Sequence, residues 1–172
     1  MGYEYVDLGL PSGTKWAKYN VGATSETGYG NFYQYGKGSA TYNASDSAYT
    51  GTEDPLSFSV DTARQTWGGS WHMPTKAQCD ELTANTTFTW TTINGVNGGK
   101  FTASNGNYIF IPAAGHWNNS SYTNEGSRGF IFSSSPSGTS NTGAFHLYFS
   151  DALVSVGGAL RRYGSSVRPV LG

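Results

Sequence analysis

The chain has 172 residues, a formal net charge of -1 and only 12% charged residues, against about 25% in an average soluble protein. This near-neutral balance excludes the strongly basic surface that nucleic acids and anionic membranes attract. One domain over residues 1–172 is expected, and an aromatic content of 15% argues against disorder despite the 24 Gly.

Strand and turn signals alternate at the start of the chain. Residues 3–8 and 14–21 carry strand-forming side chains on either side of a Pro-Ser-Gly turn at 11–13. Neither a basic segment nor an apolar run marks the first residues, so we expect no signal peptide and no membrane insertion. Residues 29–55 are rich in Gly, Tyr and Ser without periodicity, which predicts a long ordered loop.

Two short helices are predicted next. Asp61 is a plausible N-cap of a helix that ends near Trp67, with Gly directly after it. Thr75 begins the Ser/Thr-x-x-Glu/Gln pattern of a capping box, which predicts a helix from Lys76 to about Ala84. The inward face of that helix is predicted to carry Cys79 and Leu82.

The second half of the chain reads as strands. The Asn105-Gly106 turn divides residues 101–111 into a hairpin, and the apolar run at 109–111 predicts a central strand. Further strands are predicted at 129–133, 144–150, 152–156 and 165–170.

Alternating side chains predict one buried and one exposed face for the strand pair at 144–156. Phe145, Leu147 and Phe149 alternate with residues of another kind, His146, Tyr148 and Ser150. A face that mixes His, Tyr and Ser is unusual for plain solvated surface, so it is a candidate binding patch.

The tail uses a restricted set of residue types. From residue 118 to the end there is no Lys, Gln, Met, Trp or Cys, and Glu appears once, at Glu125. Tyr, Ser, Gly and Asn, which prevail there, are the residues enriched in antibody paratopes. The missing types are also nearly those that an Asn codon cannot reach by changes at its adenines. These features indicate a recognition surface diversified at adenines; the alternative is a polar loop region of no special role.

No catalytic or metal-binding constellation is recognisable. The three His residues, His72, His116 and His146, lack metal-ligand spacing. Cys79 has no basic neighbours that would activate it, and no pair of carboxylates reads as a general acid and base. We therefore expect no enzyme activity and no cofactor.

Sequence blocks along the whole chain resemble a known family. They begin at Val6 (VDLGLPSGTKWAKYNVGA), Gly68 (GGSWHMPTKAQCDEL), Trp90 (WTTINGVNGGKF), Tyr108 (YIFIPAAG) and Ser166 (SVRPV). In this order they resemble the major paralogous domains of Bacteroides and related gut bacteria and phages, which are similar to the formylglycine-generating-enzyme and C-type lectin-like proteins. The resemblance implies an α+β, C-type lectin-like fold with a small twisted antiparallel sheet, two short helices and long ordered loops.

The tail resembles the variable proteins of diversity-generating retroelements. The resemblance rests on GFIFSSSP from Gly129 and on SVRPV, with Phe132 standing where Trp is usual. It implies that residues 116–170 form a variable, ligand-binding region. Combined with the alternation above, it gives as candidate ligand-binding residues Trp117, Asn118, Asn119, Tyr122, Ile131, His146, Tyr148, Ser150, Leu153, Ser155, Arg162, Tyr163 and Ser165.

Two departures from related proteins bear on function. Formylglycine-generating enzymes use paired cysteines, whereas this chain has one. Calcium-dependent lectins carry Glu-Pro-Asn or Gln-Pro-Asp with Trp-Asn-Asp, and this chain has neither triplet. The predicted function is a non-enzymatic module on a phage virion or bacterial cell surface that binds an extracellular protein or a surface glycan. The alternative is a static structural or adhesin domain without a diversified site.

Overall fold

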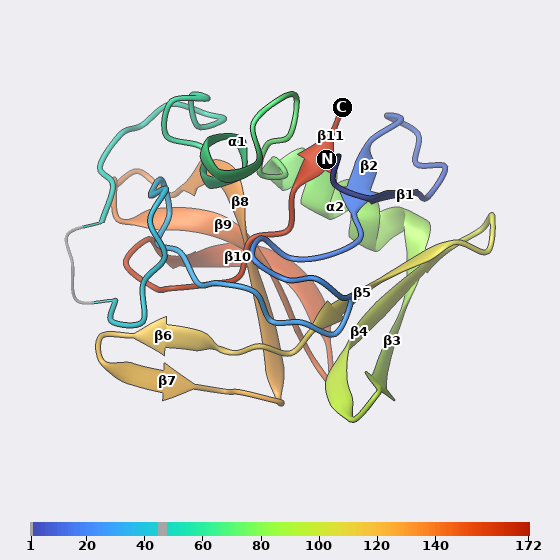
Figure 1. Cartoon of the computed structure of the whole chain (residues 1–172). Coiled ribbons are helices and arrows are strands. Elements are labelled where there is room, and N and C mark those ends of the chain that lie inside the picture. The colour runs from blue at the N-terminus through green and yellow to red at the C-terminus, as the bar shows by residue number, and fades with distance from the viewer. Residues whose placement is uncertain (1, 45–47) are drawn as a thin grey trace.

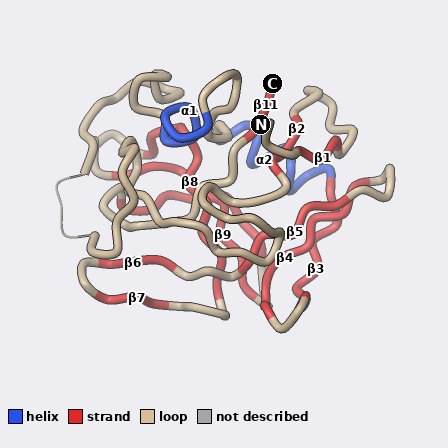
Figure 2. The backbone as a smooth tube through the Cα atoms, viewed as in Figure 1, coloured by secondary structure: helices blue, strands red, loops and turns tan. Residues whose placement is uncertain are grey.

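The computed structural model describes residues 2–44 and 48–172 and shows an α+β protein in which strands far outnumber helices (Figures 1 and 2). The mixed α+β class with antiparallel pairing is confirmed. In chain order the elements are β1 (Tyr5–Asp7), β2 (Lys15–Ala17), α1 (Thr62–Trp67), α2 (Lys76–Asn85), β3 (Thr86–Ile93), β4 (Val96–Ala103), β5 (Tyr108–Pro112), β6 (His116–Asn118), β7 (Ser121–Thr123), β8 (Arg128–Ser137), β9 (Gly143–Ser150), β10 (Val154–Leu160) and β11 (Val170–Leu171).

The described strands form four small antiparallel sheets. Their orders are β1-β2-β11, β10-β9-β8, β3-β4-β5 and the β6-β7 hairpin. Because β1 and β11 both pair with β2, the two ends of the chain lie together, on the opposite side of the molecule from β6 and β7 (Figure 1). Neither helix in the described part of the chain is long and apolar enough to cross a membrane.

Both predicted helices are confirmed together with their caps. The Asp61 carboxylate accepts a hydrogen bond of 2.9 Å from the Arg64 amide and so caps α1. At α2 the Thr75 side chain and the side chain of Gln78 bond each other's backbone amides, completing the capping box. The inward residues of α2 are fully buried, as predicted, at Cys79 and Leu82.

The predicted hairpin at Asn105-Gly106 joins β4 to β5, and a second Asn-Gly pair joins β3 to β4. Asn94 and Gly95 both have positive φ, at 49° and 79°, as the tight hairpin turn that matches strand twist requires. The prediction that 109–111 forms a central strand is wrong, because β5 lies at the edge of its sheet. Its apolar run reflects burial on both faces, not pairing on both sides.

The predicted strand at 165–170 is also corrected. Only Val170–Leu171 forms a strand, while Ser165 and Ser166 make isolated bridges to Tyr33 and Ile131. Pro169 within this stretch has no amide hydrogen to donate, so a continuous ladder is unfavourable.

The main core packs α2 against the sheets β3-β4-β5 and β8-β9-β10. Phe149 lies at its centre, with ring centroids 5.8, 6.4 and 6.0 Å from those of Phe88, Trp90 and Phe101. A Cβ atom on Gly129 would lie 2.0 Å from the Phe149 ring, so a residue without a side chain is needed there. Two of the tryptophans, Trp16 and Trp71, are buried, whereas Trp90 is half-buried against this core.

The long loop predicted at 29–55 packs on the sheet formed by β8, β9 and β10; its residues 45–47 lie outside the described residues. The Tyr35 ring contacts Phe132 at 5.9 Å between centroids, and its hydroxyl donates to the Ser134 carbonyl at 3.0 Å. The Ser134 backbone also accepts a hydrogen bond from the Leu56 amide and donates one to the Pro74 carbonyl. These bonds connect β8 to the loop and to the segments that precede α1 and α2.

Two buried arginines fasten the tail to the first half of the chain. Arg168 donates to the Asn20 side chain at 2.8 Å and to the Ala17 and Phe110 carbonyls at 3.1 and 2.8 Å. Arg161 donates to the carbonyls of Tyr49, Gly51 and Gly143 at 3.0, 2.6 and 2.8 Å. Burial lowers the pKa of Arg168 to about 9, which leaves it charged at neutral pH.

Candidate functional site

The register of β8, β9 and β10 brings the predicted outward residues onto one face. Tyr148 of β9 lies opposite Ser155 of β10 and Phe130 of β8, and His146 lies opposite Gly157 and Phe132. The next residues along β9, Leu147 and Phe149, point into the main core. Leu147, Phe149, Tyr148 and Ser155 follow the predicted alternation, but His146 and Ser150 are buried, so the outward face is not exposed throughout as predicted.

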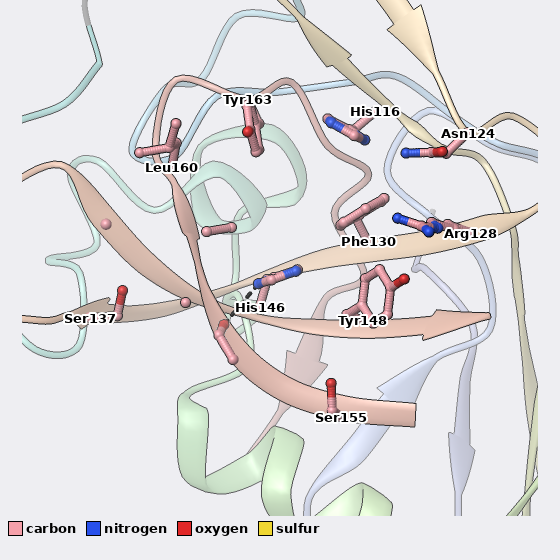
Figure 3. Close-up of a pocket in the computed structure, with 14 residues that line it drawn as sticks. His116, Asn124, Arg128, Phe130, Ser137, His146, Tyr148, Ser155, Leu160 and Tyr163 are labelled. Atoms are coloured by element: carbon pink, nitrogen blue, oxygen red, sulfur yellow. Dashed lines mark hydrogen bonds between the residues drawn. The ribbon is translucent and has the colours of Figure 1, made fainter. Parts of the chain in front are cut away.

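This face forms the floor of a pocket of about 720 Å³ that is open to solvent, here called the β8–β10 pocket. Figure 3 shows His116, Asn124 and Tyr163 facing the sheet from segments outside it, with Arg128 and Tyr148 at one end and Ser137 and Leu160 at the other. The pocket is lined by His116, Asn124, Arg128, Phe130, Ser137, Gly143, His146, Tyr148, Ser155, Gly157, Gly158, Ala159, Leu160 and Tyr163.

Aromatic rings make up much of the wall. Phe130 stacks beside His146 at 5.4 Å with an interplanar angle of 12°, and meets the edge of Tyr148 at 5.2 Å. The His116 ring lies 4.4 Å from Phe130 and 4.8 Å from Tyr163. Edge-to-face and offset-stacked contacts of this kind are favourable, and here they link the rings of the wall to one another.

His146 is held as a neutral imidazole. Its Nδ1 lies 2.8 Å from the Gly157 carbonyl, which can only accept, so Nδ1 carries the proton. Burial lowers the pKa of His146. Burial also lowers the pKa of His116, with smaller contributions from His146 and Arg128.

We expect these two imidazoles to make the protein less stable in acid. The unfolded chain binds their protons from about pH 6.5 downward, while the folded chain resists doing so, so the free energy of unfolding falls as pH drops below 6.5. Urea denaturation at pH 7.5 and at pH 5 measures this loss. In the variant His116→Asn/His146→Asn the loss should shrink, whereas an equal loss in both proteins would contradict the assignment. Comparison with the variant isolates the histidines, because Asp61 affects the pH dependence of stability in the opposite direction. Burial raises the pKa of Asp61, so this group makes the free energy of unfolding rise as the pH falls.

A second group of predicted residues forms a rim beside Tyr163. The Arg162 guanidinium donates to the side-chain oxygens of Asn118 and Asn119 at 2.7 and 3.0 Å. Trp117 stacks on Tyr122 with centroids 5.1 Å apart and an interplanar angle of 14°. Arg162 also lies over the Tyr163 ring, which joins the rim to the pocket.

Four predicted residues do not belong to either group. Ile131 is fully buried on the opposite face of β8 and contacts the main core, so its assignment as a binding residue is corrected. Ser165 is buried, with its backbone paired to Tyr33. Ser150 is buried, and its hydroxyl accepts from the Ala152 amide. Leu153 is exposed in the turn between β9 and β10, outside the pocket.

The pocket also contains residues that the sequence reasoning missed. The candidate list did not include Gly157, which lies in the floor of the pocket, or four of its side chains: Phe130, Arg128, His116 and Asn124. Alternation within β8 places Phe130 and Ile131 on opposite faces, but only the register of β8 against β9 shows that Phe130 is the outward one. His116 and Asn124 come from outside the sheet, and no local pattern marks them.

The polar side chains that line the pocket are those of His, Arg, Asn, Ser and Tyr. The described residues that line it include no Asp, Glu or Cys. Nowhere in residues 2–44 and 48–172 do three His, Cys, Asp or Glu side chains lie close enough together to hold a metal ion. Cys79 is fully buried under α2, and burial raises the pKa of its thiol, so it stays protonated at neutral pH.

Comparison with known proteins adds no relative. No protein-family model, no curated protein and no solved structure matches this chain.

Proposed function

We propose that this chain is a non-enzymatic ligand-binding module that recognises its ligand in the β8–β10 pocket and along the Arg162 rim. The observation that carries the proposal is the division of β9. One side, with Leu147 and Phe149, fills the core, and the other, with His146 and Tyr148, lines an open pocket. The proposal predicts that residues on that outward side can change with little effect on the core packing of Leu147 and Phe149.

The wider proposal is a C-type lectin-like domain that resembles the variable proteins of diversity-generating retroelements, displayed on a phage virion or bacterial cell surface. Two short helices, small antiparallel sheets and long ordered loops support that fold assignment. The buried serines of the GFIFSSSP block and the buried arginine of SVRPV support the idea of a fixed frame around a changeable face. The ligand would be an extracellular protein or a surface glycan.

We expect that filling the pocket abolishes ligand binding without unfolding the protein. A Cβ atom on Gly157 would meet no heavy atom within 4 Å, and its backbone is in an ordinary conformation, so Gly157→Trp places an indole in the pocket without strain. The matched control is Thr89→Trp, on the exposed side of the edge strand β3. Labelled wild-type and variant proteins would be applied to arrays of bacterial glycans and purified surface proteins. Ligands bound by wild type and by Thr89→Trp, but not by Gly157→Trp, are the expected result.

Two results of this binding experiment would count against the proposed function. Equal binding by Gly157→Trp and wild type would place recognition elsewhere and overturn it. Failure of the wild type to bind anything on arrays that represent its own habitat would favour the static structural alternative. A reverse-transcriptase gene with a template repeat that matches residues 116–170 would distinguish an actively diversified protein from a static relative.

A further inference from the structure

The described lining of the β8–β10 pocket carries one cationic side chain and no carboxylate. That cation is Arg128, an exposed residue at the start of β8, whose guanidinium lies 5.7 Å from the centre of the Tyr148 ring. Its guanidinium makes no hydrogen bond or ion pair with any described residue, whereas its backbone bonds Asn124 and Gly115. Arg162 on the neighbouring rim, by contrast, is already bonded to Asn118 and Asn119. Arg128 is therefore the cation that an anionic group would meet in this pocket.

His146 offers a ligand a hydrogen-bond acceptor, whereas Arg128 offers it a donor. Its Nδ1 donates to the Gly157 carbonyl, so in the neutral ring Nε2 is a bare acceptor. In Figure 3 the ring nitrogen away from Gly157 points toward the space between Phe130 and Tyr148. Among the described residues no donor bonds it, so a hydroxyl group of a ligand can do so.

Two aromatic rings form the part of the wall between Arg128 and His146. The rings of Phe130 and Tyr148 lie 5.2 Å apart between the acceptor and the cation, close enough to contact one small cyclic ligand. A volume of about 720 Å³ falls in the range of roughly 300–1,000 Å³ that is typical of sites for small ligands. A ring with a C–H face, hydroxyl donors and an anionic substituent matches all three groups at once.

We propose that the β8–β10 pocket binds a sugar residue that bears a carboxylate, such as a uronic acid in a surface polysaccharide. Arg128 donates to the carboxylate, His146 accepts from a ring hydroxyl, and Phe130 with Tyr148 contacts the C–H face. The inference rests on the proposed function and names the ligand class of the same pocket. A protein ligand would use a broad contact surface, whereas these groups converge within one hollow.

Matched sugars provide the test. Methyl glycosides of galacturonic, glucuronic and mannuronic acid differ from those of galactose, glucose and mannose only by a carboxylate in place of a hydroxymethyl group. Titration of each into the intact 172-residue chain, followed by NMR chemical shifts, gives its Kd. At least one acid should bind about tenfold more tightly than its neutral partner, as a charge-assisted hydrogen bond allows.

Variants of Arg128 show whether the preference comes from the proposed contact. Arg128→Gln should bring the ratio of acid to neutral affinity close to one while leaving the melting temperature unchanged, because the side chain is exposed. Arg128→Lys should keep part of the preference, since it retains the charge but not the two-pronged geometry. Lys100→Gln removes a positive charge from β4, outside the pocket, and should leave the ratio unchanged.

The outcomes separate this inference from the proposed function. If no acidic sugar binds, if neutral sugars bind equally well, or if Arg128→Gln leaves the preference intact, the inference is overturned. Binding of a sulfated glycan without any carboxylate-bearing sugar would overturn it as well. In each of these cases a ligand that binds wild type but not Gly157→Trp would still uphold the proposed function.

Discussion

Replacing Arg168 with Ala should destabilise the protein by roughly 3–5 kcal/mol, the cost of leaving several buried acceptors without a donor. The side chain is fully buried and donates to one side-chain oxygen and to carbonyls of both β2 and β5. Without the guanidinium these buried acceptors lose their protein donor. Arg168→Lys should remain clearly destabilised, because one ammonium group cannot reach acceptors spread over two strands.

Urea denaturation with linear extrapolation measures these differences. Arg128→Ala is the matched control, because this arginine is exposed and its side chain makes no hydrogen bond to the described residues; a change within about 0.5 kcal/mol is expected. A comparable loss for both arginines, or a small loss for both, would mean that Arg168 does not fasten the tail as described.

Substitutions at neighbouring residues of β9 should affect different properties. At an inward residue the stability should fall, and at an outward residue the ligand affinity should fall. Phe149→Ala should cost roughly 3–5 kcal/mol, because a large ring is removed from a closely packed cluster with Phe88 and Phe101. Tyr148→Ser should cost no more than about 1 kcal/mol, because this ring is half-buried in the pocket wall. Its binding effect should be large, since Tyr is a frequent hot-spot residue.

A small library makes the comparison decisive. Substitutions at His146, Tyr148 and Ser155 would be combined and compared by thermal denaturation with substitutions at Leu147 and Phe149. The outward combinations should melt close to wild type, and the inward ones far below it. If both sets unfold the protein equally, the outward face is part of the core, and recognition by this face is ruled out.

Local patterns predicted those parts of the fold that depend on few neighbours. The capping residues Asp61 and Thr75 mark both helix starts, since a cap involves only the next three residues. Period-two alternation identified the outward face of β9 and β10 for the same reason. The turn at Asn94-Gly95 carries the same signal as Asn105-Gly106, and the alternating residues of β3 before it, such as Phe88 and Trp90, could have identified this hairpin as well.

Features that depend on distant segments were not predictable in this way. Burial of β5 on both faces resembles a central strand in sequence, because the apolar run records burial and not the number of paired neighbours. His116 enters the pocket only because the β6-β7 hairpin lies over β8, and Tyr163 because the chain turns back after β10. Ile131 was assigned to the wrong face, since the register of β8 against β9 fixes which residue points outward.

The pairing of both chain ends with β2 has a mechanical consequence. Tyr5 lies at the Ala17 end of β2, and Leu171 lies at the opposite end, beside Lys15. A force that pulls these two ends apart therefore runs along the strands and loads the hydrogen bonds of β1-β2-β11 in shear, so that they must break together and not one after another. The sheet that carries the β8–β10 pocket makes no strand pair with this one. Tension between the ends is thus first borne by this small sheet, whose residues Trp16 and Val170 pack in the same core as Leu147 and Phe149 of β9.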